Sequence, residues 1–182
     1  MACKLPVSRN RYSYSYRRAL AVVECGHGIG SCGSVIISFR CRAQPSNPRA
    51  IAPKGATRFW ITVPQSVNCV IGNFNSMAGA QRYVPQIPSA RVVDLAGAIS
   101  PGSERKRIGI TPVEKRRLKM LPTEHAHRAI RQEVRHLVMP TPTEWGFEPP
   151  AGDSMADDFC YSSETNDQWL SVAQIGSMLN EC

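Results

Sequence analysis

The sequence lacks the patterns that most often identify a metalloprotein or a membrane protein. Its seven cysteines include no CxxC pair, and the spacing of Cys25, Cys32 and Cys41 matches no common zinc site. No apolar run is long enough to span a bilayer, and residues 1–18 lack the apolar core of a secretory signal peptide. These absences predict an intracellular protein with reduced thiols, no bound metal and no membrane-spanning segment.

Signatures of catalysis are also scarce. No nucleophile–base arrangement, carboxylate pair or phosphate loop stands in an interpretable context. Residues 28–33 do spell GxGxxG. A dinucleotide-binding loop would lead into a helix, but residues 34–39 are β-branched and strand-like. We therefore expect a glycine-rich turn between strands at 19–24 and 34–40, and a non-enzymatic protein that binds no cofactor.

The composition predicts a chain that is mostly irregular. Hydrophobic residues make up 42% of the 182 residues, and 14 prolines interrupt them. Globular domains usually contain about 45–50% apolar residues. We therefore expect a largely disordered chain with a small α+β part, in which strand-like segments lie within residues 19–71.

Charge is distributed unevenly along the chain, which has a formal net charge of +8. Residues 1–60 and 101–140 each contain ten Lys or Arg, whereas residues 141–182 contain none and carry eight acids. A basic body suits nucleic-acid phosphates or acidic proteins, and an acidic tail can bind that body or a basic partner. Solubility alone is the alternative explanation.

The same patterns divide the chain into five regions. They are a basic Cys/Gly-rich segment at 1–43, a linker at 44–56, a strand-rich region at 57–99, a basic helical region at 100–139, and an acidic, mostly disordered tail at 140–182. The first region has the composition of a mitochondrial or plastid transit peptide, although the stretch before Met77 also fits a real domain or an upstream extension. In the third region, residues 57–63 read as a strand with Phe59 and Trp60 in the core, and residues 67–71 as its partner.

The strongest local signals predict a helical hairpin at 112–138. Thr111 and Glu114 form a capping box around Pro112, and Pro122 ends that helix. Thr123 caps a second helix, whose apolar residues recur every three or four positions from Ala126 to Leu137. A further amphipathic helix is expected at about 168–179, with Asp167 as its cap.

Two functions fit these helices. The first is a regulatory or adaptor protein of the nucleus or cytoplasm that binds protein partners, because residues 116–118 resemble the Arg-x-Leu docking peptides that cyclins recognise. Ser100, Thr111 and Thr141 each precede proline and are candidate phosphorylation sites for proline-directed kinases. The alternative is an RNA-binding component of a ribonucleoprotein such as a mitochondrial ribosome. The candidate contact residues are Lys115, Arg116, Arg117, Leu118, Lys119, Arg128, Arg131 and Arg135 in the basic helices, and Trp169, Val172 and Ile175 in the terminal helix.

Overall fold

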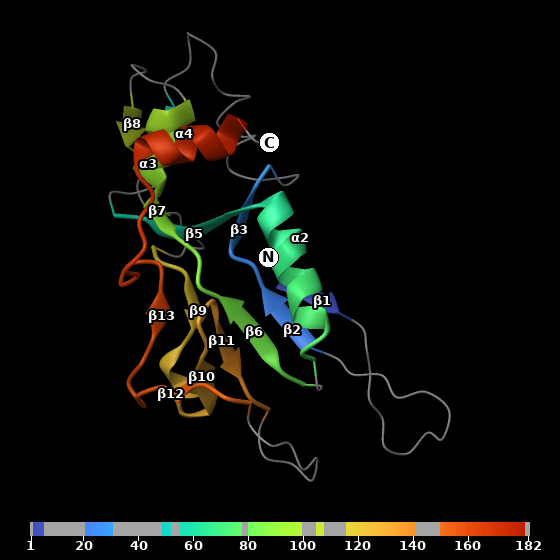
Figure 1. Ribbon diagram of the computed structural model, residues 1–182. Coiled ribbons are helices and arrows are strands. Elements are labelled where there is room, and N and C mark those ends of the chain that lie inside the picture. Colours follow the sequence, from blue (N-terminus) through green and yellow to red (C-terminus); the bar gives the residue numbers. More distant parts are fainter. Residues whose placement is uncertain are drawn as a thin grey trace. The chain divides into compact units, whose positions relative to one another are not determined.

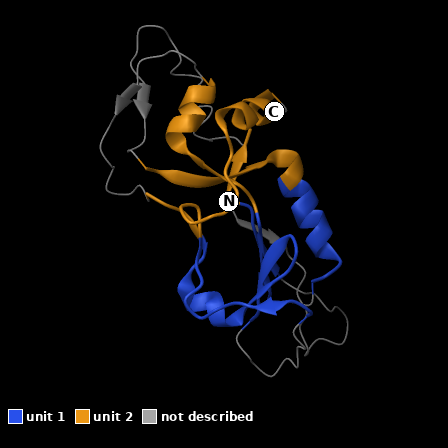
Figure 2. Ribbon diagram, turned by 60° about the vertical axis from the view of Figure 1, so that its left-hand side comes forward, with its two compact units in different colours: residues 1–25, 66–86, 120–161 blue, residues 26–65, 87–119, 162–182 orange. Residues whose placement is uncertain are grey.

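The computed structural model of the chain describes most of its residues and shows a mixed α/β fold (Figure 1). The chain divides into two compact units (Figure 2): unit 1 comprises residues 1–25, 66–86 and 120–161, and unit 2 comprises residues 26–65, 87–119 and 162–182. The predicted mostly disordered chain is therefore wrong. Among the described residues, no helix combines the length and apolar character needed to cross a membrane. The described residues are 2–5, 21–30, 49–51, 55–77, 80–99, 105–107, 116–140 and 150–180.

Unit 1 is built around a six-stranded sheet. Its strands, in spatial order, are β1 (Ala2–Leu5), β2 (Ala21–Glu24), β6 (Arg82–Pro85), β11 (Arg135–Val138), β10 (Ala129–Arg131) and β12 (Asp153–Ser154). The pairing of β2 with β6 is parallel, and the other neighbours are antiparallel. β2 thus lies in the predicted first strand but pairs with β1 and β6, while the predicted partner at 34–40 is outside the described residues.

The predicted helical hairpin at 112–138 is wrong. Its second half forms a short 3₁₀ helix, η1 (Thr123–Arg128), followed by the β10–β11 hairpin. Ile130 lies opposite Leu137 in that hairpin. Residues seven apart share a helix face, but they can equally face each other across a short turn, so the apolar spacing did not distinguish the two. Val134, which the helix would have buried, sits in the turn and is 68% exposed. In the first half, residues 111–115 with the capping residues fall outside the described residues, whereas Lys119–Leu121 form a strand, β9, where the helix was expected to end.

Unit 2 contains a three-stranded sheet in the order β3 (His27–Ile29), β5 (Thr57–Thr62) and β7 (Ser89–Arg91). β5 pairs parallel with β3 and antiparallel with β7. β5 occupies the predicted strand, and the expected burial of Phe59 and Trp60 is confirmed. A separate parallel pair joins β4 (Arg49–Ile51) and β8 (Arg105–Arg107).

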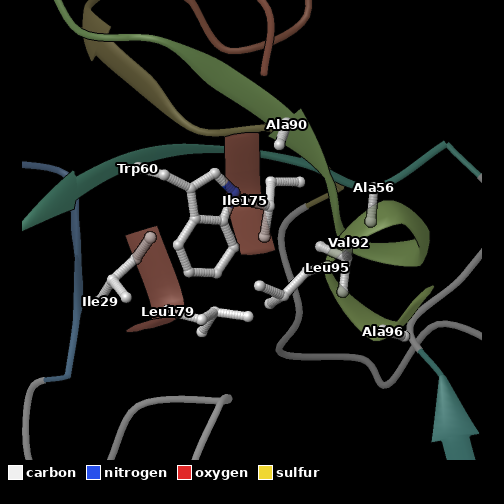
Figure 3. Close-up of a cluster of buried hydrophobic side chains, with 9 residues drawn as sticks. All are labelled: Ile29, Ala56, Trp60, Ala90, Val92, Leu95, Ala96, Ile175 and Leu179. Carbon is white, nitrogen blue, oxygen red and sulfur yellow. The ribbon is translucent and has the colours of Figure 1, made fainter. Parts of the chain in front are cut away.

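The hydrophobic core of unit 2 surrounds Trp60, whose side chain is only 2% exposed (Figure 3). Helices α3 (Val92–Ile99) and α4 (Val172–Asn180) contribute Leu95, Ile175 and Leu179 to the same cluster. Burying one large aliphatic side chain contributes roughly 1.5–3 kcal/mol. Residues 92–99, at the end of the region expected to be strand-rich, are helical, and their apolar face packs in this core.

Two capping boxes explain where helices α2 and α4 begin. Before α2 (Val63–Phe74), the amide of Thr62 donates to Gln65 Oε1 at 3.0 Å, and the amide of Gln65 donates to Thr62 Oγ1 at 3.3 Å. The strand predicted at 67–71 is thus wrong. Ser171 and Gln174 exchange the same bonds before α4, at 2.8 and 3.3 Å, so α4 begins later than a cap at Asp167 would place it.

Much of the predicted disordered tail is ordered. β13 (Tyr161–Ser162) pairs with β9 (Lys119–Leu121). In unit 2, the amide of Ser89 donates to the carbonyl of Gln168 and the amide of Leu170 donates to the carbonyl of Ser89, both at 2.8 Å. Backbone pairing of this kind adds the segment before α4 to the edge of β7. Of this tail, residues 150–180 are described.

Candidate anion-binding site

Arg58 places a guanidinium group on the sheet of unit 2. Its neighbours in β5, Thr57 and Phe59, are 5% and 0% exposed, whereas Arg58 itself is only half-buried. Arg58 Nη1 donates to the carbonyl of Thr57 at 2.8 Å and to the carbonyl of Arg116 at 3.1 Å. These two bonds fix the orientation of the guanidinium and bring a distant segment of the chain beside β5.

That segment adds a second guanidinium. The amide of Thr57 donates to the carbonyl of Arg116 at 3.1 Å, so Arg116 is anchored through its backbone. Its side chain extends over Gly55: a Cβ built on Gly55 would lie 3.0 Å from Arg116 Nη2. Gly55 also has a φ of +89°, which side-chain-bearing residues rarely adopt. Glycine here therefore serves both the turn before β5 and the close approach of Arg116.

Ser163 anchors the backbone of residues 116–118 through Leu118. Its side chain is fully buried, and its hydroxyl contacts Thr57 Oγ1 at 2.8 Å and accepts from the amide of Leu118 at 3.0 Å. The amide of Ser163 donates back to the carbonyl of Leu118 at 2.9 Å. Arg117, between the anchored residues, forms a 2.6 Å ion pair with Glu164 in which both side chains are about half exposed.

Together, Arg58, Arg116, Arg117 and Glu164 carry a net charge of +2, from three guanidinium groups and one carboxylate. Guanidinium groups bind phosphate and carboxylate oxygens through two parallel hydrogen bonds, so an excess of them on a scaffold held by backbone bonds suits an anionic ligand. We call these three arginines the arginine cluster. Its chemistry is binding and charge neutralisation rather than proton transfer.

His27, on β3, lies close enough to Arg58 of the arginine cluster to feel its charge. It is in register with Trp60, and the two rings are tilted, with their centroids 5.7 Å apart. Burial, reinforced by the positive charge of Arg58, lowers the pKa of His27 to about 4. The imidazole is therefore neutral at pH 7. Among the described residues, neither His27 Nδ1 nor Trp60 Nε1 has a hydrogen-bond partner, although both atoms are buried.

The structure divides the predicted contact residues between the two units. Arg116 and Arg117 belong to the arginine cluster, with Leu118 half-buried and Lys119 exposed after them, and Lys115 is outside the described residues. Of the terminal residues, Ile175 is in the core of unit 2, while Trp169 and Val172 are 42% and 46% exposed. Ser100, Thr111 and Thr141 are also outside the described residues.

The other three predicted arginines lie in unit 1, and two of them are engaged locally. Arg128 Nη2 is 3.0 Å from His125 Nδ1, and Arg131 is exposed on β10. Arg135 donates to Asn73 Oδ1, and its guanidinium carbon lies 5.1 Å from the centre of the Tyr83 ring. They therefore do not form the single basic face that a helix would have given them.

Sequence reasoning missed Arg58, Gly55, Ser163 and His27. Arg58 and Arg116 are 58 positions apart, and only the pairing of Thr57 with the 116–118 segment brings them together. One local signal did exist: a charged residue between the buried positions of an otherwise apolar strand often faces a polar partner or a ligand.

Comparison with known proteins relates the chain to enzymes of sugar metabolism. Residues 1–139 match the family described as polysaccharide biosynthesis protein. Over 186 aligned residues the chain is 32% identical to UDP-N-acetylglucosamine 4,6-dehydratase (inverting) of Campylobacter jejuni subsp. jejuni serotype O:23/36 (strain 81-176). It is 30% identical to the protein of the same name from serotype O:2 (strain ATCC 700819 / NCTC 11168). Each alignment covers 97% of this chain and 56% of the relative, so the chain spans about half the length of these relatives.

A solved structure supports the fold. The X-ray structure of Pen from Bacillus thuringiensis is similar with a TM-score of 0.75 and 18% sequence identity, over 92% of this chain and 51% of that chain. This likeness concerns the fold alone. It agrees with the mixed α/β architecture described above and further contradicts a mostly disordered chain.

The comparisons also correct the predicted function. The matched family is one of polysaccharide biosynthesis, and the relatives are named as dehydratases. The predicted non-enzymatic adaptor, and the alternative of an RNA-binding ribonucleoprotein component, are therefore both wrong. The prediction rested on the absence of a compact catalytic motif, and such an absence does not exclude an enzyme, because functional groups can come together through tertiary structure alone.

Proposed function

The chain belongs to the polysaccharide biosynthesis protein family, and from this membership we propose that it acts on a nucleotide-linked sugar by removing water from UDP-N-acetylglucosamine. The observation that carries the proposal is the 32% identity to a dehydratase of that substrate, which extends over 97% of the chain. The chain spans 56% of that relative, so we assign to its described residues only one part of the proposed activity, which is the binding of the substrate.

We assign the diphosphate of the substrate to the arginine cluster. Both phosphate groups of a nucleotide diphosphate sugar are negatively charged at neutral pH. Arg58 is held rigidly by two carbonyl oxygens, and Arg116 lies over the Gly55 backbone, so little side-chain entropy is lost when they bind. The neutral imidazole of His27 adds no further charge beside them. The net charge of +2 on the cluster and its Glu164 partner therefore supports binding of a diphosphate.

Calorimetric titration of the full chain with UDP-N-acetylglucosamine, UDP and uridine tests this assignment. We expect saturable binding of the two diphosphates and much weaker binding of uridine, because uridine lacks the phosphates. Losing one charged hydrogen-bonding contact costs roughly 1.5–3 kcal/mol. Arg58→Met and Arg116→Met should therefore weaken UDP binding roughly ten- to hundred-fold.

Arg131→Met is the matched control, because Arg131 is an exposed arginine on β10 of unit 1. It should bind UDP as tightly as the wild type. Raising the salt concentration should weaken UDP binding to the wild type more than to Arg58→Met. Equal affinity for uridine and UDP, or unchanged UDP affinity in both cluster variants, would show that the arginine cluster does not hold the diphosphate.

A further inference from the structure

Two thiols of unit 1 are in contact. Cys25 follows the last residue of β2 and is 3% exposed, and Cys69 lies in the middle of α2 and is half-buried. Neither is in a disulfide, and their side chains are hydrogen-bonded to each other. A buried thiol beside a partly exposed one is the arrangement in which one sulfur meets a reagent and the other responds to the product.

A polar network surrounds the sulfur of Cys69. Asn73, one turn further along α2, donates from Nδ2 to Cys69 Sγ at 3.4 Å and to the Cys69 carbonyl at 2.6 Å. Its Oδ1 accepts a hydrogen bond from Arg135, a residue of β11. Asn73 therefore connects a guanidinium from the sheet to a thiol on the helix, and its own side chain is held from both sides.

This network favours the thiolate form of Cys69. The hydrogen bond from Cys25, followed by that from Asn73 and the charge of Arg135, outweighs burial and lowers the pKa of Cys69 from 9.0 to about 7. About half of the molecules then carry the thiolate at neutral pH, and the thiolate is the nucleophilic form of cysteine.

We propose that Cys69 and Cys25 form a thiol oxidation site, at which a peroxide oxidises Cys69 and Cys25 then closes a disulfide with it. The Cys69 thiolate attacks one peroxide oxygen, the O–O bond breaks, and hydroxide leaves, so that Cys69 becomes a sulfenic acid. The Cys25 sulfur attacks the Cys69 sulfur, its proton leaves with the hydroxyl as water, and the S–S bond forms. In total two thiols lose two electrons and two protons, and hydrogen peroxide becomes two waters. The site does not depend on the proposed sugar chemistry.

Cys25 is the expected resolving thiol because it already contacts the Cys69 sulfur and lies outside regular secondary structure. Cys160, the other described half-buried thiol of unit 1, provides the internal comparison, since nothing described at Cys160 resembles the Asn73–Arg135 network.

The test treats the reduced full chain with hydrogen peroxide and maps the cysteines by mass spectrometry of non-reduced peptides. We expect a peptide pair linked through Cys25 and Cys69. In Cys25→Ser, the Cys69 sulfenic acid should persist and be trapped by dimedone. A linked pair that joins Cys69 to another cysteine, or dimedone labelling of Cys160 in preference to Cys69, would overturn the assignment.

A second measurement separates the role of the hydrogen bond from a merely structural one. The rate of Cys69 alkylation by iodoacetamide should follow a titration with its midpoint near pH 7 in the wild type. Cys25→Ser retains a hydrogen-bond donor and should keep that midpoint, whereas Cys25→Ala should move it to higher pH and slow alkylation at pH 7 several-fold. The same pH profile in Cys25→Ala and Cys25→Ser would refute the proposed activation of Cys69.

Discussion

Acidification should destabilise unit 1 through His136. This side chain lies in β11, where it pairs with Val84 of β6, and it is 3% exposed. Its ring centroid is 5.4 Å from that of Phe159 and 4.9 Å from that of Tyr161. Burial, with a smaller contribution from the charge of Arg131, lowers the pKa of His136 from 6.5 to about 4. The folded chain therefore holds the neutral imidazole, and the unfolded chain protonates first as the pH falls.

The sign and the size of the effect follow from these two values. Stability from the neutral imidazole is complete above pH 6.5 and is lost as the pH falls toward 4. At pH 5 the unfolded form is almost fully protonated and the folded form about one-tenth protonated. The difference corresponds to a loss of about 2 kcal/mol in the free energy of unfolding between pH 7.5 and pH 5.

Urea unfolding followed by far-UV circular dichroism at the two pH values measures this loss. His136→Phe keeps an aromatic ring between Phe159 and Tyr161 but cannot be protonated, so it should lose about 2 kcal/mol less than the wild type. His27 and Glu24 titrate alike in both proteins, so they cancel in the comparison. The exposed His127→Gln should behave like the wild type. Equal pH dependence in His136→Phe and the wild type would refute the argument from burial.

Three further predictions concern unit 2. Trp60→Ala removes the side chain at the centre of the hydrophobic cluster and should cost about 3–5 kcal/mol in urea unfolding, more than any exposed substitution. Gly55→Ala places a side chain at a positive φ and crowds Arg116, so it should lower the free energy of unfolding by about 1–2 kcal/mol and weaken UDP binding in calorimetry. Unchanged UDP binding would show that Gly55 does not help to position the arginine cluster. Thr62→Ala removes the acceptor for the Gln65 amide and should lower stability by about 1 kcal/mol, which Thr62→Ser should largely restore.

Local sequence rules predicted some elements well and failed where two structures share one pattern. The strand at β5 and the burial of Phe59 and Trp60 followed from β-branched and aromatic residues. The Thr62–Gln65 capping box was equally readable but was overlooked, because the apolar residues after it also fit a strand. In residues 123–138, the spacing of apolar residues fitted both a helix and the hairpin that forms.

Composition underestimated the ordered part of the chain for a different reason. Small and polar residues fill much of the interior: Ala90, Ser89 and Ser163 are all fully buried. Burying a hydroxyl group costs little free energy when the group is hydrogen-bonded, as the Ser163 hydroxyl is to Thr57 and to the backbone amide of Leu118. A count of large apolar residues cannot detect this kind of core. For the same reason the candidate site was only half predicted: Arg116 and Arg117 stand out as basic residues, but Arg58 joins them only through long-range backbone pairing.

The most direct test of the proposed function is to incubate the protein with UDP-N-acetylglucosamine and follow the sugar nucleotide by mass spectrometry. The account predicts a product lighter than the substrate by one water, formed more slowly by Arg58→Met and at the wild-type rate by Arg131→Met. Unchanged substrate together with saturable binding would reduce the chain to a binding role and reject the dehydration. Product formed equally fast by Arg58→Met and the wild type would contradict the arginine cluster as the diphosphate site.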